Sequence, residues 1–118
     1  MRYMLLIYGD ESRYAEVSEE EGQADMQRWF DYTNELQQAG VMEAGEALQP
    51  TSTATSVRDD GGKPLVTDGP FAETREQLGG YYVFNVPNLD DAIKWAHKCP
   101  GIAYGTMELR PIMEIPAT

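Results

Sequence analysis

The chain has 118 residues with 20 acidic and 9 basic side chains, which gives a formal net charge of −11. This length allows one domain with a single hydrophobic core, and we expect that domain to span residues 1–118. The basic residues are scattered from Arg2 to Arg110, an arrangement that argues against nucleic acid or an anionic membrane surface as a direct partner.

The first predicted element is a strand over residues 2–8. Both of its faces are apolar, which indicates a central strand that is covered on both sides. This apolar run is too short for a signal peptide, and no segment approaches the roughly 20 apolar residues that a membrane span requires. We therefore expect a cytoplasmic protein.

A helix is predicted after Ser18, because Ser18 and Glu21 have the spacing of a capping box, in which each side chain satisfies a backbone N–H at a helix start. Gly40 is the expected end of this helix. The apolar stripe that we expect to be buried consists of Met26, Trp29, Phe30, Thr33 and Leu36.

Residues 41–48 are predicted to form a second strand. Two polar strands, over residues 53–58 and 63–67, then flank the sequence DDGG, which is typical of a hairpin turn because Asp and Gly tolerate positive φ angles. We expect this hairpin at an edge of the sheet. Residues 81–86 form the next apolar strand, again with bulky side chains on both faces.

A second helix is predicted between Asn88, a good N-cap, and Pro100. Its expected buried stripe is Leu89, Ala92, Ile93, Ala96 and Cys99. The last predicted strand, residues 106–115, alternates between polar and apolar side chains, and its apolar face comprises Met107, Leu109, Met113 and Ile115.

This order of elements predicts an α+β fold, the ferredoxin-like split βαβ sandwich with an inserted β-hairpin. Two helices in that plan cover only one face of the sheet. The strands over residues 2–8 and 81–86 are apolar on both faces, so the other face would expose large apolar side chains to water. We therefore expect a homodimer in which two sheets pack against each other.

The turn from Asp68 to Phe71 carries the first candidate catalytic residue. Gly69 permits an unusual backbone and Pro70 fixes its own φ, so the Asp68 carboxylate is held on a stiff corner that suits a general acid or base. In the alternative interpretation the turn is structural. Asp68 then accepts hydrogen bonds from backbone N–H groups two or three residues later, while Phe71 fills the core below.

Four other residues are weaker candidates. Glu46 would be a catalytic partner if it turned inward, because a buried carboxylate must be paired or protonated. Tyr82 or Arg110 would orient an anionic ligand that Phe71 contacts, although Arg110 pairing with a neighbouring glutamate is the alternative. The aromatic side chains that either line a pocket between sheets or form core and dimer contacts are Tyr3, Tyr8, Tyr81, Tyr82 and Phe84.

The sequence offers no familiar cofactor or metal site. One histidine and one cysteine do not make a usual zinc site, and no carboxylate spacing matches a calcium or magnesium loop. A Gly-rich phosphate loop and a nucleophile elbow are likewise missing. We therefore predict no cofactor and no metal.

Four segments together resemble the DGPF-domain branch of the YCII-related protein family: MRYMLLIYGDE, GEALQP, KPLVTDGPFAETREQLGGYYVFNV and MELRPIMEI. The resemblance covers nearly the whole chain. It implies a ferredoxin-like fold and a dimeric α/β-barrel arrangement. It also implies a possible sigma-factor partner, because genes of this branch often lie beside, or are fused to, sigma factors of the extracytoplasmic-function type.

The resemblance implies enzymatic chemistry that this sequence only partly supports. Relatives have been proposed to be enzymes with a His–Asp pair, one of them a dehydrochlorinase, and the histidine comes from the first helix. Here that helix contains no histidine, and the corresponding position is at or near Trp29. Two functions follow as hypotheses: a dimer that binds a small organic ligand near Asp68, with carboxylate catalysis, or a regulatory protein that associates with a sigma factor.

Overall fold

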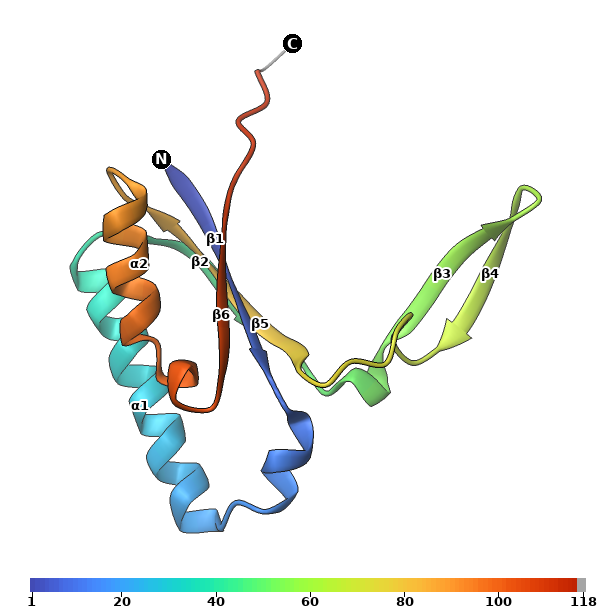
Figure 1. Cartoon of the computed structure of the whole chain (residues 1–118), viewed down its shortest axis with the longest axis horizontal. Coiled ribbons are helices and arrows are strands. Elements are labelled where there is room, and N and C mark those ends of the chain that lie inside the picture. The colour runs from blue at the N-terminus through green and yellow to red at the C-terminus, as the bar shows by residue number, and fades with distance from the viewer. Residues whose placement is uncertain (117–118) are drawn as a thin grey trace.

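The computed structural model of the chain describes residues 1–116 and contains a four-stranded sheet with two α-helices on one side (Figure 1). The strands of this sheet are β1 (Arg2–Gly9), β2 (Met42–Ala47), β5 (Gln77–Asn85) and β6 (Gly105–Pro111). The helices are α1 (Glu19–Gln38) and α2 (Leu89–Lys98), and short 3-10 helices occur at η1 (Glu11–Ala15), η2 (Thr51–Thr53) and η3 (Pro100–Ala103).

The strand order is β2-β5-β1-β6, and each neighbouring pair is antiparallel. This is the order of the ferredoxin-like plan, so the predicted fold class is confirmed. The strands β1 and β5, which are apolar on both faces, occupy the two central positions. The last strand ends at Pro111 rather than at residue 115, because its register with β1 ends where Pro111 pairs with Tyr3 and the Ile112 N–H donates to the Arg2 carbonyl.

The helix caps predicted from the sequence are present. The Ser18 hydroxyl accepts a hydrogen bond from the Glu21 backbone N–H at 3.1 Å. Glu21 does not complete the capping box, because its carboxylate accepts a hydrogen bond from Arg28 at 2.7 Å instead. Gly40 follows α1 with a φ of 70°, and the Asn88 side chain accepts a hydrogen bond from the Asp91 N–H at 2.9 Å.

The core lies between the two helices and one face of the sheet, and the predicted stripe of α1 is wrong in part. Met26 and Phe30 are 59% and 63% exposed, whereas Tyr32, which the stripe omitted, is buried. The reason is length: α1 has 20 residues and α2 has 10, so the first half of α1 extends beyond its neighbour. The buried cluster consists of Tyr3, Leu5, Tyr32, Leu36, Val41, Tyr82, Phe84, Val86, Ala92, Ala96 and Cys99.

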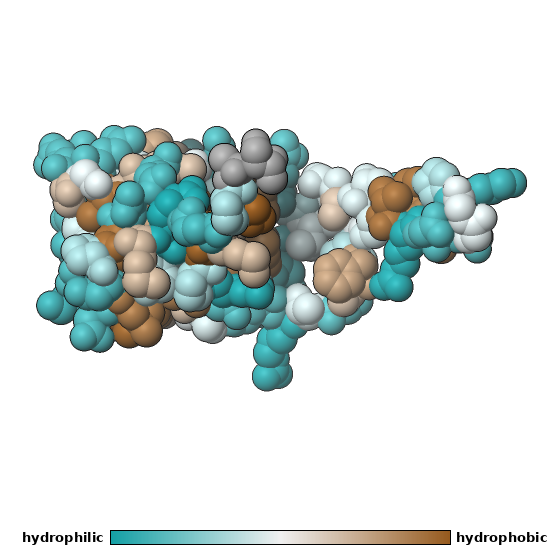
Figure 2. All heavy atoms as spheres, turned by 90° about the horizontal axis from the view of Figure 1, so that it is seen from above, coloured by the Kyte–Doolittle hydropathy of each residue, from teal (hydrophilic) through white to brown (hydrophobic). Residues whose placement is uncertain are grey.

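The inserted hairpin forms an arm that projects from the body (Figures 1 and 2). The arm comprises β3 (Thr55–Asp60) and β4 (Lys63–Asp68), joined by Gly61 and Gly62 with φ angles of 60° and 93°. The hairpin prediction is therefore confirmed, but its expected place at the edge of the main sheet is wrong, because the two strands make a sheet of their own.

The base of the arm is fixed by a contact between η1 and η2. The Glu11 carboxylate accepts hydrogen bonds from the Thr51 backbone N–H at 2.8 Å and from the Thr51 hydroxyl at 2.7 Å. This contact holds the segment after β2 against η1, so the chain leaves the sheet before it reaches β3. Within residues 1–116 we find no helix with the length and apolar character needed to cross a bilayer.

Candidate functional site

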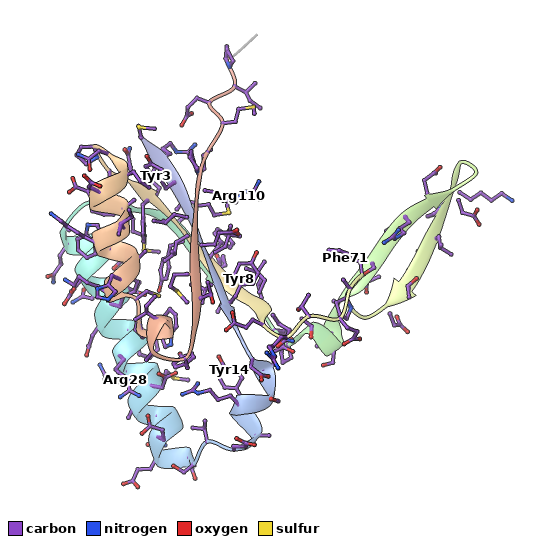
Figure 3. The ribbon with its side chains drawn as sticks, viewed as in Figure 1. Tyr3, Tyr8, Tyr14, Arg28, Phe71 and Arg110 are labelled. Atoms are coloured by element: carbon purple, nitrogen blue, oxygen red, sulfur yellow. The ribbon has the colours of Figure 1, made fainter. Side chains whose placement is uncertain are left out.

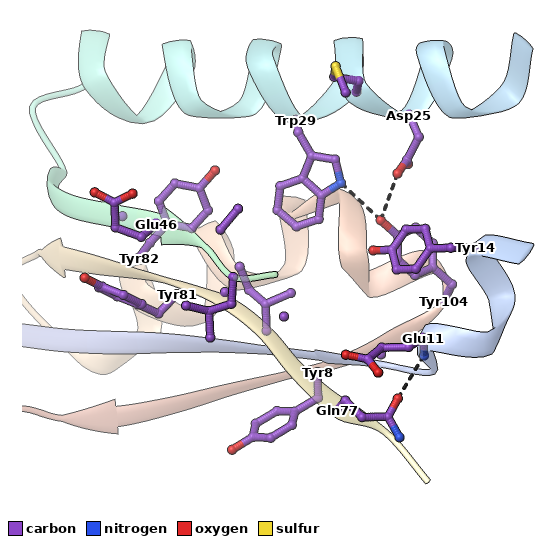
Figure 4. Close-up of a pocket in the computed structure, with 18 of the residues that line it drawn as sticks. Tyr8, Glu11, Tyr14, Asp25, Trp29, Glu46, Gln77, Tyr81, Tyr82 and Tyr104 are labelled. Atoms are coloured by element: carbon purple, nitrogen blue, oxygen red, sulfur yellow. Dashed lines mark hydrogen bonds between the residues drawn. The ribbon is translucent and has the colours of Figure 1, made fainter. Parts of the chain in front are cut away.

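A cleft of about 700 Å³ opens between the first half of α1, η1 and one end of the sheet. It exists because α2 is too short to cover the first half of α1, so side chains such as Met26 and Phe30 face open space. Figure 4 shows Trp29 and Asp25 reaching from α1 toward the sheet, with Tyr104 beside them. The walls are largely apolar and aromatic, as is usual for small-molecule sites.

One end of the cleft carries a chain of hydrogen bonds among three side chains. The Trp29 indole N–H donates to the Tyr104 hydroxyl at 3.1 Å, and that hydroxyl donates to the Asp25 carboxylate at 3.1 Å. Burial raises the pKa of Tyr104 to about 12, and the neighbouring Asp25 charge adds to this shift. Tyr104 is therefore a neutral hydrogen-bonding group near neutral pH.

The Tyr104 ring and the Trp29 indole are held by close packing. The Arg13 guanidinium lies over the Tyr104 ring, 3.6 Å from its centroid, in a cation–π contact. Gly101 lies against the Trp29 indole, and a Cβ at that position would come within 3.4 Å of the indole and 2.8 Å of the Met107 side chain. The lack of a side chain at Gly101 thus permits the observed position of Trp29.

A second polar pair lies further along the same wall. The hydroxyls of Thr33 and Tyr82 are 2.6 Å apart and hydrogen-bonded. Burial raises the pKa of Tyr82, although the hydrogen bond with Thr33 opposes that shift. Gly45 makes room for the ring, because a Cβ there would lie 2.6 Å from a Tyr82 ring carbon. The cleft therefore offers three hydrogen-bonded hydroxyl groups, those of Thr33, Tyr82 and Tyr104, on largely apolar walls.

Of the catalytic and ligand-binding candidates predicted from the sequence, Tyr82 and Glu46 line the cleft, and so do Tyr8 and Tyr81 from the set of aromatic residues expected either to line a pocket or to form core and dimer contacts. Glu46 is exposed at the rim of the cleft, so the inward orientation that would make it a catalytic partner is not observed. The turn at Asp68 ends β4 at the base of the arm, and Asp68 is not brought beside Glu46 or Tyr82 in this cleft.

The Asp68 carboxylate is exposed and takes part in none of the side-chain hydrogen bonds within residues 1–116. The turn is held instead by Gly69, whose φ is 93° and whose N–H donates to the Ala54 carbonyl at 2.7 Å, and by the Ser56 hydroxyl, which donates to the Gly69 carbonyl. The interpretation of Asp68 as a side-chain cap of the turn is therefore wrong. Its catalytic role stays a prediction.

Phe71 does not fill a core, because it is 80% exposed on the arm side of the molecule, where no packed layer lies beneath it (Figure 3). Arg110 lies on the sheet face opposite the helices, since its neighbour Leu109 packs on the core. Arg110 forms no ion pair with Glu108 or Glu114 within residues 1–116, so the alternative in which it pairs with a neighbouring glutamate is wrong. Arg2 lies 3.6 Å from Glu114, and Glu108 accepts a hydrogen bond from Tyr8 at 3.4 Å.

The polar residues of the cleft were largely missed in the sequence. Asp25 and Trp29 are four residues apart on a helix, a spacing that puts them on one face and could have drawn attention to the pair. Arg13 lies in η1, which precedes α1, and Tyr104 follows η3, and no local pattern links either residue to Asp25 and Trp29. Within residues 1–116, no three His, Cys, Asp or Glu side chains are grouped so that they could hold a metal ion.

A model of the YCII-related domain matches residues 1–116. An uncharacterised protein of Rhizobium meliloti (strain 1021) is 35% identical over 114 residues, which cover 95% of this chain and 92% of that protein. The chain is also similar to a solved structure of 5-chloro-2-hydroxyhydroquinone dehydrochlorinase from Burkholderia phenoliruptrix AC1100 in complex with 2,5-dihydroxybenzoquinone. The TM-score is 0.52 at 7% identity, over 96% of this chain and 94% of that one, so this likeness shows a shared fold alone.

Proposed function

Because this chain belongs to the YCII-related family, whose domain model matches residues 1–116, we propose that it binds a small organic ligand in the cleft beside α1. The observation that carries the proposal is a cleft of about 700 Å³ whose aromatic walls present two hydrogen-bonded tyrosine hydroxyls. Sites for small molecules typically combine such apolar walls with a few fixed polar groups. A protein of the same fold is known in complex with a small organic molecule, which is consistent with this proposal.

The test fills the cleft without unfolding the protein. Met26 is exposed on α1 and lines the cleft, so Met26→Trp places a large ring in the open space. Gln23→Trp is the matched control, because Gln23 is exposed on the same helix and does not line the cleft. With the neutral fluorescent probe N-phenyl-1-naphthylamine, we expect saturable binding to the wild type and to Gln23→Trp, and at least a tenfold loss of affinity in Met26→Trp. If both variants bind the probe with equal affinity, the probe does not bind in the cleft and the proposal is refuted.

We also propose that the protein is a cytoplasmic homodimer. Both helices lie on one side of the sheet, and the opposite face carries apolar side chains from the central strands, where Leu6 pairs with Tyr81 and Met4 pairs with Val83. A second copy packed sheet to sheet would cover that face. Light scattering at micromolar concentration should give twice the chain mass, and a stable monomer would contradict the dimer while leaving the cleft untouched.

The second candidate function is regulation through a sigma factor of the extracytoplasmic-function type. It is favoured by the net charge of −11, which suits a basic protein surface as partner. Titration of this protein with a purified sigma factor of that type, at two salt concentrations, distinguishes the two candidate functions. A regulatory role predicts a complex that weakens with salt and that Met26→Trp leaves intact, whereas the ligand-binding proposal requires no such complex.

A further inference from the structure

We infer that the cleft takes a flat ligand that is neutral or positively charged, and that Asp25 accepts a hydrogen bond from it. This inference rests on the ligand-binding function proposed above and names the chemical class of the ligand. It depends on which hydrogen-bonding capacity remains free at the polar end of the cleft, and on the charges that surround it.

The Asp25 side chain lies at this end of the cleft and is only 13% accessible to solvent. One carboxylate oxygen accepts the Tyr104 hydroxyl proton at 3.1 Å. The other lies 3.5 Å from the Arg28 guanidinium, whose shorter contact, 2.7 Å, is with Glu21. Because a carboxylate can accept about four hydrogen bonds, Asp25 retains acceptor capacity.

Tyr104 leaves the same kind of capacity free. Its hydroxyl has a single proton, which is donated to Asp25, and one of its two lone pairs accepts the Trp29 indole N–H. The network therefore leaves hydrogen-bond acceptors free for a ligand: one lone pair on the Tyr104 hydroxyl and further lone pairs on the Asp25 carboxylate. A ligand that meets them must bring an N–H or O–H donor.

The surrounding charges act in the same direction. Among the described residues that line the cleft, four are acidic, namely Asp10, Glu11, Asp25 and Glu46, and one, Arg13, is basic. Asp10 and Glu11 are engaged with Ser12 and Thr51, so they contribute charge rather than free hydrogen-bonding groups. Arg13 is stacked over the Tyr104 ring. An anion would enter a region of net negative charge, whereas a cation would gain from it.

The flatness of the ligand follows from the walls. The Trp29 indole, the Tyr104 ring and the Phe30 ring all border the same space, and aromatic faces stack best on planar groups. A planar ring with an amidine, amine or amide substituent would place its apolar body on these rings and its donors on Asp25.

The test uses three probes of the same size and shape that differ in charge: benzamidine, benzamide and benzoate. Titration of the wild-type protein, followed by the NMR shifts of backbone amides and of the Trp29 indole N–H, should rank benzamidine above benzamide and benzoate last. We expect benzamidine to bind about tenfold more tightly than benzoate, the size of effect typical of a hydrogen bond to a charged group.

Two matched substitutions each remove one charge from the same end of the cleft. Asp25→Asn keeps an oxygen that can accept from Tyr104, and should weaken benzamidine about tenfold while changing benzamide by less than about threefold. Arg13→Gln should leave the ranking of the probes unchanged. If Asp25→Asn does not fold, the wild-type ranking and the benzamidine-induced shift of the Trp29 indole N–H decide the question.

The outcomes separate this inference from the proposed function. If benzoate binds best and Arg13→Gln abolishes that preference, the cleft is an anion site organised by Arg13 and the inference is wrong. If N-phenyl-1-naphthylamine binds in the cleft while the three probes bind equally or not at all, the ligand-binding function stands and the inference fails. If neither the dye nor the probes bind, both fail.

Discussion

Gly45→Ala is predicted to destabilise the protein by crowding the Tyr82 ring. The added methyl group would lie 2.6 Å and 3.0 Å from two Tyr82 ring carbons and 3.1 Å from the end of Met42. Contacts between carbon atoms are optimal at about 3.5–4.0 Å, so the ring must move by roughly 1 Å. Such overpacking typically costs about 1–3 kcal/mol.

The Tyr82 ring has little freedom to move away. It stacks on Phe84, meets Tyr32 edge to face at a centroid distance of 5.6 Å, and is tied by its hydroxyl to Thr33. Loss of the Thr33 hydrogen bond adds about 1 kcal/mol. Alanine has less conformational entropy than glycine in the unfolded chain, which stabilises the folded state by about 0.5–1 kcal/mol and offsets part of this loss. The free energy of unfolding should therefore fall by about 2 kcal/mol.

Urea denaturation followed by Trp fluorescence measures this change, with Gly22→Ala as the control. Gly22 lies within α1 and a Cβ there meets no other atom within 4 Å, so alanine should stabilise the helix by roughly 0.5–1 kcal/mol. Opposite signs for the two substitutions are expected. Equal effects, or a stable Gly45→Ala protein, would refute the packing argument. In the double variant Gly45→Ala/Tyr82→Leu, the loss of unfolding free energy should be smaller than the sum of the losses in the two single variants.

Three further predictions concern the arm and the polar end of the cleft. Asp68→Asn should leave the melting temperature within about 2 °C of the wild-type value, because the carboxylate is exposed and takes part in none of the side-chain hydrogen bonds described for residues 1–116. If this variant then loses binding of N-phenyl-1-naphthylamine, Asp68 is a functional residue. If instead its melting temperature falls strongly while binding is intact, Asp68 is not a site residue. Gly69→Ala should destabilise the base of the arm by roughly 1 kcal/mol, because φ there is 93°; faster amide hydrogen exchange confined to residues 55–68 checks this. Tyr104 has a pKa raised from 10.0 to about 12 in the folded protein, so the folded state holds the proton more tightly and its stabilising contribution is complete below pH 10 and is lost as the pH rises toward 12. The fall in unfolding free energy over that range should be smaller in Tyr104→Phe than in the wild type by on the order of 1 kcal/mol, because solvent reaches Tyr104 and screens part of the effect. Identical pH profiles would contradict a raised pKa at Tyr104.

The elements themselves could be predicted from local pattern. The two-faced apolar strands at residues 2–8 and 81–86 lie at the centre of the sheet, and the caps at Ser18 and Asn88 begin the two helices. These signals depend on residues close together in sequence, because strand alternation, helix capping and tight turns are local properties of the backbone.

The partly wrong buried stripe of α1 shows where local pattern stops. Its spacing identifies a face of the helix, but burial requires something packed on that face, and α2 is too short to cover the first half of α1. Met26 and Phe30 therefore border a cleft instead of a core. In the same way, the structural interpretation of the Asp68 turn places Phe71 over a core, yet the hairpin leaves the sheet and carries Phe71 with it.

By itself, the sequence determined the fold class, the two central strands, the helix starts and the presence of the hairpin. Only the tertiary structure decided where the candidate site lies. Asp25 and Trp29 are joined to Tyr104 across a separation of 75 or more residues, and Tyr82 meets Thr33 across 49. Such contacts depend on the relative lengths and packing of whole elements, which no short stretch of sequence encodes. The polar end of the cleft is therefore a product of the packing of α1 beside η3 and the sheet.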